Sequence, residues 1–143
     1  TDEAISSALI ITKFIYLAQK GYTKKQIIEE LNLKPVLTKF QKFNTTCNET
    51  LNNCLYMAIN SNSFEDSIKN IISLGGDTDT NACITGSISE SLYGINQDLI
   101  EKAKTTIPQE FTELINKGYQ RIKKWIKLQK KYQYINGGII WKK

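Results

Sequence analysis

Apolar residues recur at helical spacing along most of this sequence, which restricts the chain to folds built from packed α-helices. The segments with this spacing are residues 3–20, 23–31, 46–59, 63–72 and 82–94. A shorter helix is expected after Asn96, and Pro108 stands at the first position of a last long helix. The pattern predicts an all-α fold.

Polar residues at the segment boundaries support these helix starts. A Ser or Thr is followed three residues later by Gln, Glu or Asp, the spacing of a helix cap, at Thr23–Gln26, Thr46–Glu49 and Ser63–Asp66. Residues 36–45 carry no such pattern and are predicted to form a loop. Residues 132–141 are aromatic and β-branched enough for a small hairpin around Asn136-Gly137.

Composition excludes several classes of function. The chain has 143 residues, enough for one domain or one piece of a larger one, and no histidine, which removes Ser-His-Asp catalysis and His-ligated zinc. Its longest apolar runs are far too short to cross a membrane. Cys47, Cys54 and Cys83 lack a C-x-x-C spacing, so we expect three small buried side chains in a reducing, cytoplasmic setting. The start at Thr1 and the single internal Met57 favour a fragment of a longer protein.

Charge is distributed unevenly along the chain. The net charge is +5, but no acid follows Glu113 and nine of the 19 basic residues do. Lysines alternate with apolar residues there at helical spacing, which favours an amphipathic helix with a solvated basic face over a nucleic-acid-binding surface. We therefore expect neither nucleic acid nor a membrane as partner.

Unusual residues concentrate in the segment Gly75-Gly76-Asp77-Thr78-Asp79-Thr80, at the start of an apolar helix. One interpretation is helix capping by Asp77 or Thr78, with a second acid near the positive end of the helix dipole. The other is a site for a hard cation such as Mg²⁺ or Ca²⁺, which prefers several oxygen ligands. Asp77, Asp79 and the Thr80 hydroxyl could then converge as the loop enters the helix.

The wider string from Ser63 through G-G-D-T-D-T to Tyr93-Gly94 resembles the C-terminal part of the ADP-ribosylglycohydrolase family, which includes the dinitrogenase-reductase-activating glycohydrolase. The resemblance extends upstream to the segment around Cys47 and to the helix of residues 1–21. Downstream it extends to Ile107-Pro108. It covers about residues 1–115, which we predict as the family-like domain, with residues 116–143 as a basic amphipathic C-terminal extension.

The resemblance implies an all-α orthogonal helical bundle whose cleft holds two Mg²⁺ or Mn²⁺ ions and binds ADP-ribose. It implies a hydrolase that removes ADP-ribose from a protein side chain or a related ADP-ribosyl compound. By position, Asp77, Asp79 and Thr80 would be metal ligands, and Gly75 and Gly76 would shape the substrate-binding loop. Cys47 and its neighbours would border the nucleotide pocket.

The sequence lacks the family's N-terminal half, including its G-D-x-x-G and T-D-D-T elements and the histidine of its Thr-His element. Charge gives the same answer independently, because two carboxylates neutralise only about one divalent ion. We therefore expect half an active site, completed by a missing N-terminal segment, another chain or a dimer mate. The alternative is a non-catalytic relative that binds ADP-ribose or a cation, or that has a structural role.

Overall fold

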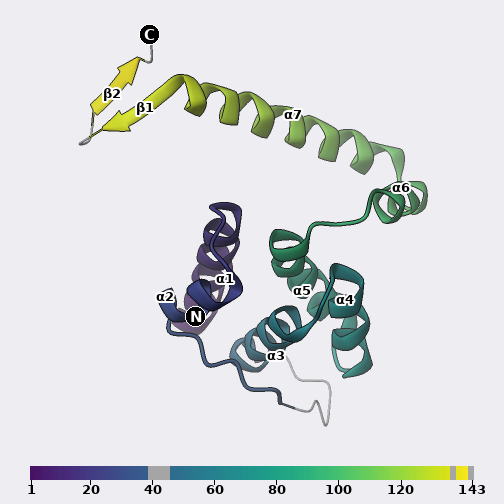
Figure 1. Cartoon of the computed structure of the whole chain (residues 1–143). Helices are drawn as coiled ribbons and strands as arrows, with labels where there is room; N and C mark the ends of the chain where they lie inside the picture. The colour runs from purple at the N-terminus through teal and green to yellow at the C-terminus, as the bar shows by residue number, and fades with distance from the viewer. Residues whose placement is uncertain (39–45, 136–137, 142–143) are drawn as a thin grey trace. The chain divides into compact units, whose positions relative to one another are not determined.

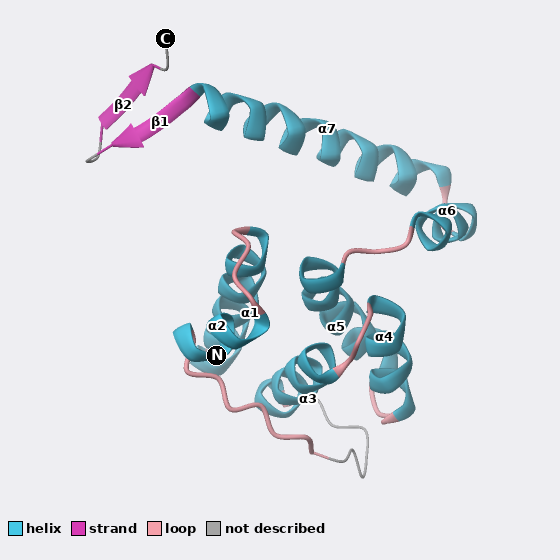
Figure 2. Ribbon diagram, viewed as in Figure 1, coloured by secondary structure: helices cyan, strands magenta, loops and turns pink. Residues whose placement is uncertain are grey.

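The computed structural model describes residues 1–38, 46–135 and 138–141, with side chains described up to residue 124 (Figure 1). In these ranges the helices are α1 Asp2–Gln19, α2 Lys24–Glu30, α3 Cys47–Asn60, α4 Phe64–Ser73, α5 Thr78–Tyr93, α6 Gln97–Thr106 and α7 Gln109–Lys131. The strands β1 Tyr132–Ile135 and β2 Gly138–Trp141 follow them (Figure 2). The predicted all-α class is confirmed, with a small hairpin at the end.

Capping explains where two of the helices begin. Thr23 and Gln26 form a complete capping box at the start of α2, and the Ser63 hydroxyl accepts from the backbone N–H of Asp66 at 3.1 Å at the start of α4. Thr46 is the N-cap of α3, but its side chain accepts no capping hydrogen bond there. Two of the three predicted caps are therefore confirmed.

The start of α3 receives a cap from α1. The Glu3 carboxylate accepts from the backbone N–H of Asn48 at 2.9 Å, and it places a negative charge at the positive end of the α3 dipole. This contact joins residues 45 positions apart, so local sequence patterns could not have predicted it.

The chain divides into two compact units, Thr1–Ile95 and Asn96–Lys143. In the first unit α5 packs against α1, α3 and α4, and α2 packs against α1. The buried apolar core of this unit consists of Phe14, Ile27, Leu51, Cys54, Leu55, Ala58, Ile71 and Ile88. Burying these side chains is the main favourable term that holds the helices together.

The absence of a side chain at Gly86 of α5 allows α4 to approach closely. A Cβ atom at Gly86 would lie 3.4 Å from the Ile68 side chain and 3.6 Å from Phe64. Ser87, the next residue of α5, is exposed.

The three cysteines differ in their surroundings. All are free thiols, with Cys54 buried, Cys47 half-buried and Cys83 exposed. The prediction of three buried cysteines is therefore confirmed for Cys54 and wrong for Cys83. Burial also raises the pKa of the Cys54 thiol to about 11.

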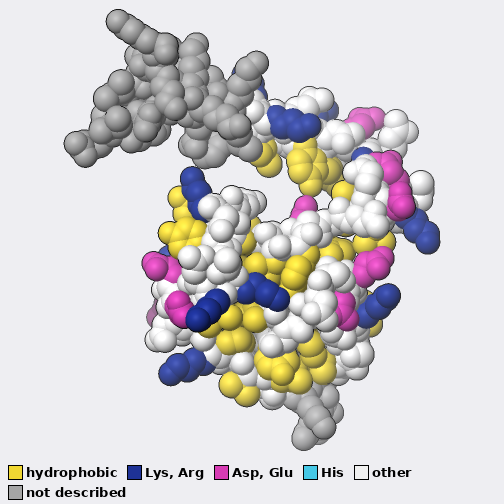
Figure 3. Space-filling model, viewed as in Figure 1, with side chains coloured by type: hydrophobic (Ala, Val, Ile, Leu, Met, Phe, Trp, Pro, Cys, Tyr) yellow, Lys and Arg dark blue, Asp and Glu magenta, His cyan; other side chains and the backbone are white. Residues whose placement is uncertain are grey.

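The second unit contains α6, α7 and the hairpin. Tyr132 pairs with Trp141 and Ile135 with Gly138, which confirms the predicted hairpin, although its turn at Asn136-Gly137 lies outside the described residues. Apolar side chains are exposed along α7, including Phe111, Leu114 and Ile122 (Figure 3). The domain boundary predicted between residues 115 and 116 falls inside α7 and stays a prediction.

Two other expectations from the sequence concern the loop at residues 36–45 and the absence of a membrane-spanning segment. Residues 36–38 of the predicted loop lie outside helices and strands, and residues 39–45 are not among the described residues. Within the described part of the chain, no helix is both long enough and apolar enough to span a bilayer.

The C-terminal end of α3 is held by side chains from α2 and α5. Lys24 Nζ donates to the Ile59 carbonyl at 3.0 Å and to Tyr93 Oη at 3.1 Å. Tyr93 Oη in turn lies 2.8 Å from the Ala58 carbonyl and 2.5 Å from that of Ser61. A cation placed at the negative end of the α3 dipole thus connects three helices.

Replacing Tyr93 by Phe should lower the free energy of unfolding by about 1–2 kcal/mol, because Lys24 loses an acceptor and an α3 carbonyl loses its donor. Urea denaturation followed by far-UV circular dichroism measures this change. The control is Tyr22→Phe, since Tyr22 is exposed and should change the midpoint little. Equal midpoints for Tyr93→Phe and the parent chain would contradict this role for Tyr93.

Candidate functional site

A left-handed turn joins α4 to α5. Gly75 has φ +78° and Gly76 has φ +74°, a backbone region that residues with a Cβ atom rarely adopt. A Cβ atom at Gly75 would contact nothing within 4 Å, so glycine is required there by backbone conformation and not by space. The turn places Asp77 at the N-cap of α5.

Asp77 does not use its carboxylate as a cap. It occupies the N-cap position of α5 but accepts no side-chain hydrogen bond from the helix, although its backbone carbonyl accepts from the Asn81 N–H at 3.0 Å. The capping interpretation is therefore wrong for Asp77. The half-buried carboxylate is available for another partner.

Asp79 lies in the first turn of α5 and is exposed. A hydrogen bond with the Asp77 side chain lowers the pKa of Asp79, and the backbone N–H groups of Thr80 and Asp79 lower it further. The two carboxyl groups are therefore near neighbours at the start of α5. Two adjacent carboxylates repel each other unless a proton or a cation lies between them.

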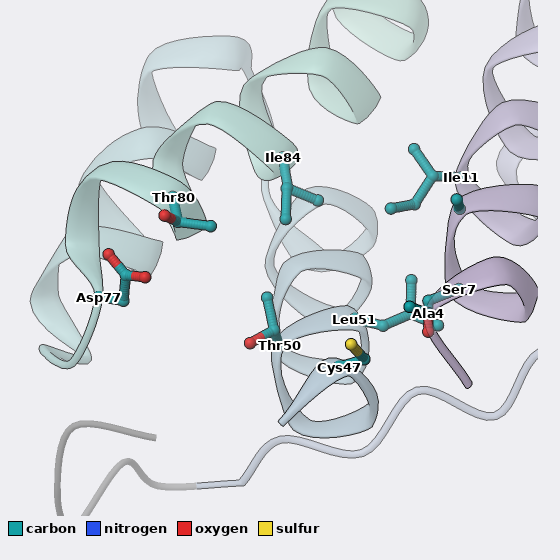
Figure 4. Close-up of a pocket in the computed structure, with 10 residues that line it drawn as sticks. Ala4, Ser7, Ile11, Cys47, Thr50, Leu51, Asp77, Thr80 and Ile84 are labelled. Atoms are coloured by element: carbon teal, nitrogen blue, oxygen red, sulfur yellow. The ribbon is translucent and has the colours of Figure 1, made fainter. Parts of the chain in front are cut away.

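Thr80 supplies a third oxygen next to this pair. Figure 4 shows Asp77 and Thr80 together at the start of α5, and both side chains line the same cavity. Of the predicted site residues, Asp77, Asp79 and Thr80 are thus brought together at one helix start. Gly75 and Gly76 form the preceding turn, and their part in binding substrate stays a prediction.

The cavity lined by Asp77 and Thr80 has a volume of about 290 Å³. On one side its wall is the α1 face that carries Ala4, Ser7, Ala8 and Ile11 (Figure 4). The small side chains on this face leave the space open. We did not predict these residues, although their spacing of three and four positions along a helix is a detectable signal.

The opposite side of the cavity comes from α3 and α5. Cys47, Thr50 and Leu51 of α3 line it, and Ile84 of α5 lies one turn after Thr80. Cys47 therefore borders this cavity, and the expectation that the cavity binds a nucleotide stays a prediction. The lining is mostly apolar, with the Asp77 carboxylate at one side.

The donor atoms fit a hard divalent cation in kind. Two carboxylates and a hydroxyl are the oxygen ligands that Mg²⁺ and Mn²⁺ accept. These ligands are few in number. Among the described residues, no cluster of three or more Asp, Glu, Cys or His side chains could hold a metal ion. The residues therefore suit one cation, and a second would need ligands from elsewhere.

Alanine at Gly75 should destabilise the turn by about 1–2 kcal/mol, because the added Cβ atom disfavours a positive φ. Urea denaturation measures the change for Gly75→Ala and for the double variant Gly75→Ala/Gly76→Ala. The matched control is Gly118→Ala, since Gly118 lies inside α7 with no atom near an added Cβ, and alanine there should be neutral or stabilising. A Gly75→Ala variant as stable as the parent chain would show that the turn does not depend on glycine.

Comparison with models of protein families gave a match to the family described as ADP-ribosylglycohydrolase over residues 2–134. Searches of curated proteins and of solved structures gave no match. The family match extends beyond residue 115, where the resemblance seen in the sequence ended, and includes all of α7. The chain belongs to the ADP-ribosylglycohydrolase family.

Proposed function

We propose that this chain supplies the Asp77–Thr80 part of a metal-dependent hydrolase that removes ADP-ribose from a modified side chain or from a related ADP-ribosyl compound. The observation that carries the proposal is the Asp77 carboxylate. It makes no capping bond, lies beside Asp79 and faces a cavity, in a chain of this family. An ADP-ribosylated protein or an ADP-ribosyl small molecule is the corresponding substrate.

Each residue of the segment has a distinct task in this proposal. Asp79, with Asp77 and the Thr80 hydroxyl, would hold Mg²⁺ or Mn²⁺. The turn at Gly75 and Gly76 places Asp77 at the N-cap of α5, with Asp79 in the first turn of the same helix. A cation bound there would supply Lewis-acid chemistry, which suits a chain without histidine.

The complete family site is expected to hold two divalent ions, with a combined charge of +4. Asp77 and Asp79 contribute −2, and burying the uncompensated remainder would be strongly unfavourable. Glu3 is already bonded to the α3 N-terminus, so it is engaged elsewhere. We therefore propose that further carboxylates come from a segment outside the described residues or from another chain.

A second candidate is a non-catalytic relative that binds a cation or ADP-ribose. It is favoured by the small number of metal-binding side chains among the described residues. Mn²⁺ stoichiometry and turnover separate the two. Two tightly bound ions per chain with release of ADP-ribose from a modified protein would support a complete enzyme, and one weakly bound ion without release would support the module.

Asparagine at Asp77 or Asp79 should weaken Mn²⁺ binding by at least about tenfold, because each change removes a charged ligand. Loss of the free Mn²⁺ signal in electron paramagnetic resonance measures binding, and circular dichroism checks that helix content is unchanged. Thr80→Val should weaken binding less, since a hydroxyl is neutral.

The matched control for Asp79→Asn is Asp98→Asn. Asp98 also lies in the first turn of a helix, α6, so its replacement makes the same change to the dipole of a helix in the other unit of the chain. Mn²⁺ affinity should be unchanged in this control. Affinity that survives in both Asp77→Asn and Asp79→Asn would refute the assignment of the ligands.

A further inference from the structure

The cavity beside Asp77 and Thr80 has an unusual charge for a nucleotide-binding site. Asp77 is the one charged side chain among the described residues that line it, and no Lys or Arg contributes. Protein sites that bind phosphate groups generally offer arginine, lysine or free backbone N–H groups. The N-terminus of α3 reaches the cavity wall at Cys47, and that of α5 reaches it at Asp77. The first already binds the Glu3 carboxylate through the Asn48 N–H, and the second carries Asp77 and Asp79.

A diphosphate in this cavity would be poorly stabilised. Its negative charges would lie against the apolar side chains of Ile11, Leu51 and Ile84 and beside the Asp77 carboxylate. Removing such an anion from water without a positive partner in the wall costs several kcal/mol. A cation held by Asp77 and Asp79 would offset this at one edge only.

The space and lining instead suit an uncharged group. A volume of about 290 Å³ is large enough for a group of several ring atoms, since one water takes up about 30 Å³ of the liquid. The side chains of Ala4, Ser7 and Ala8 are small and project little from α1, so a flat ring can lie against this helix. Apolar walls with a few polar groups at one side are typical of sites that bind such ligands.

We infer that this cavity takes the uncharged group attached to C1 of the ribose held at Asp77, Asp79 and Thr80, and that the diphosphate lies outside it. The inference rests on the proposed function, because hydrolysis of a bond at ribose C1 requires that ribose to lie beside the cation that Asp77, Asp79 and Thr80 would hold. It assigns substrate choice to the α1 wall: the side chains at positions 4, 7 and 8 set the size of the group that fits.

Cys47 provides a reporter inside the cavity. Its half-buried thiol lines the α3 side of the wall. Cys83 is exposed and outside the lining, and Cys54 is buried with its pKa raised to about 11 by burial, so it reacts slowly near pH 8. In a Cys83→Ser chain, a thiol reagent such as dithionitrobenzoate therefore reports on Cys47.

The experiment measures the rate of Cys47 modification in the full chain with Mn²⁺ and each of three probes. Adenosine carries an uncharged base on ribose C1, ribose 5-phosphate has no such base, and pyrophosphate has no ring. We expect adenosine to slow modification about tenfold at ~10 times its half-protection concentration, because only free protein reacts. Ribose 5-phosphate and pyrophosphate should leave the rate within about twofold of the unprotected value.

A pair of α1 variants tests the position of the bound group. Ala8→Leu places a large side chain in the cavity wall and should abolish protection by adenosine. Ser6→Leu makes a similar change at an exposed residue outside the lining and should leave protection intact. The ratio of rates with and without adenosine is compared within each variant, so a changed intrinsic reactivity of Cys47 does not affect the result.

Three outcomes would overturn the inference: no protection by adenosine, equal protection by pyrophosphate, or full protection in the Ala8→Leu variant. The Mn²⁺ titration separates this failure from failure of the proposed function. Normal Mn²⁺ binding through Asp77 without protection by adenosine would reject the cavity assignment alone. Protection by adenosine without Mn²⁺ binding would reject the metal-dependent function and retain an uncharged-ligand site.

Discussion

The packing of α5 against α1, α3 and α4 is the constraint on which the rest of the site depends. Ile88 is fully buried on α5, and Gly86 lets the Phe64 and Ile68 side chains of α4 approach it closely. These contacts fix the axis of α5, and the axis fixes where its first turn lies. The far end of the helix is held through Tyr93 and Lys24, which bind the last carbonyls of α3. A rigid helix supported in this way can hold functional side chains more accurately than a loop could.

The turn before α5 has two features that lower the stability of the fold. Two successive glycines with positive φ lose more conformational freedom on folding than other residues would, and Asp77 stands at an N-cap without making the capping bond. Each feature lowers stability, and both occur where the chain enters α5 beside Asp77 and Asp79. The hydrogen bond with the Asp77 side chain is the largest cause of the lowered pKa of Asp79, so the two side chains at this helix start interact directly.

Local patterns predicted the helices, the hairpin and the residues at the start of α5, because spacing and capping act over a few residues. Contacts between distant segments could not be predicted in this way. The cap that Glu3 gives to α3 is one, and the cavity wall made by Ala4, Ser7 and Ala8 is another. The buried face of α5 was also predicted only in part. The spacing of apolar residues predicted which apolar side chains are buried, but the structure also buries Asn81, Thr85 and Ser89. Periodicity of apolar residues does not detect a buried polar face.

The cavity and the carboxylate pair share Asp77 and Thr80, so a ligand in the cavity and a cation at the pair would meet at the same helix start. The two halves of the site differ in the chemistry they favour. The carboxylates attract positive charge and exclude anions, while the α1 and α3 walls favour groups without charge. A substrate that satisfies both must present its hydroxyl-bearing part toward Asp77 and an uncharged part toward Ala8 and Leu51. Under the proposed function, the phosphates of such a substrate would need positive charge from outside this helix start, and further carboxylates would come from elsewhere for the same electrostatic reason. In that proposal Asp77, Asp79 and Thr80 would hold the cation, and the α1 and α3 walls would hold the uncharged group.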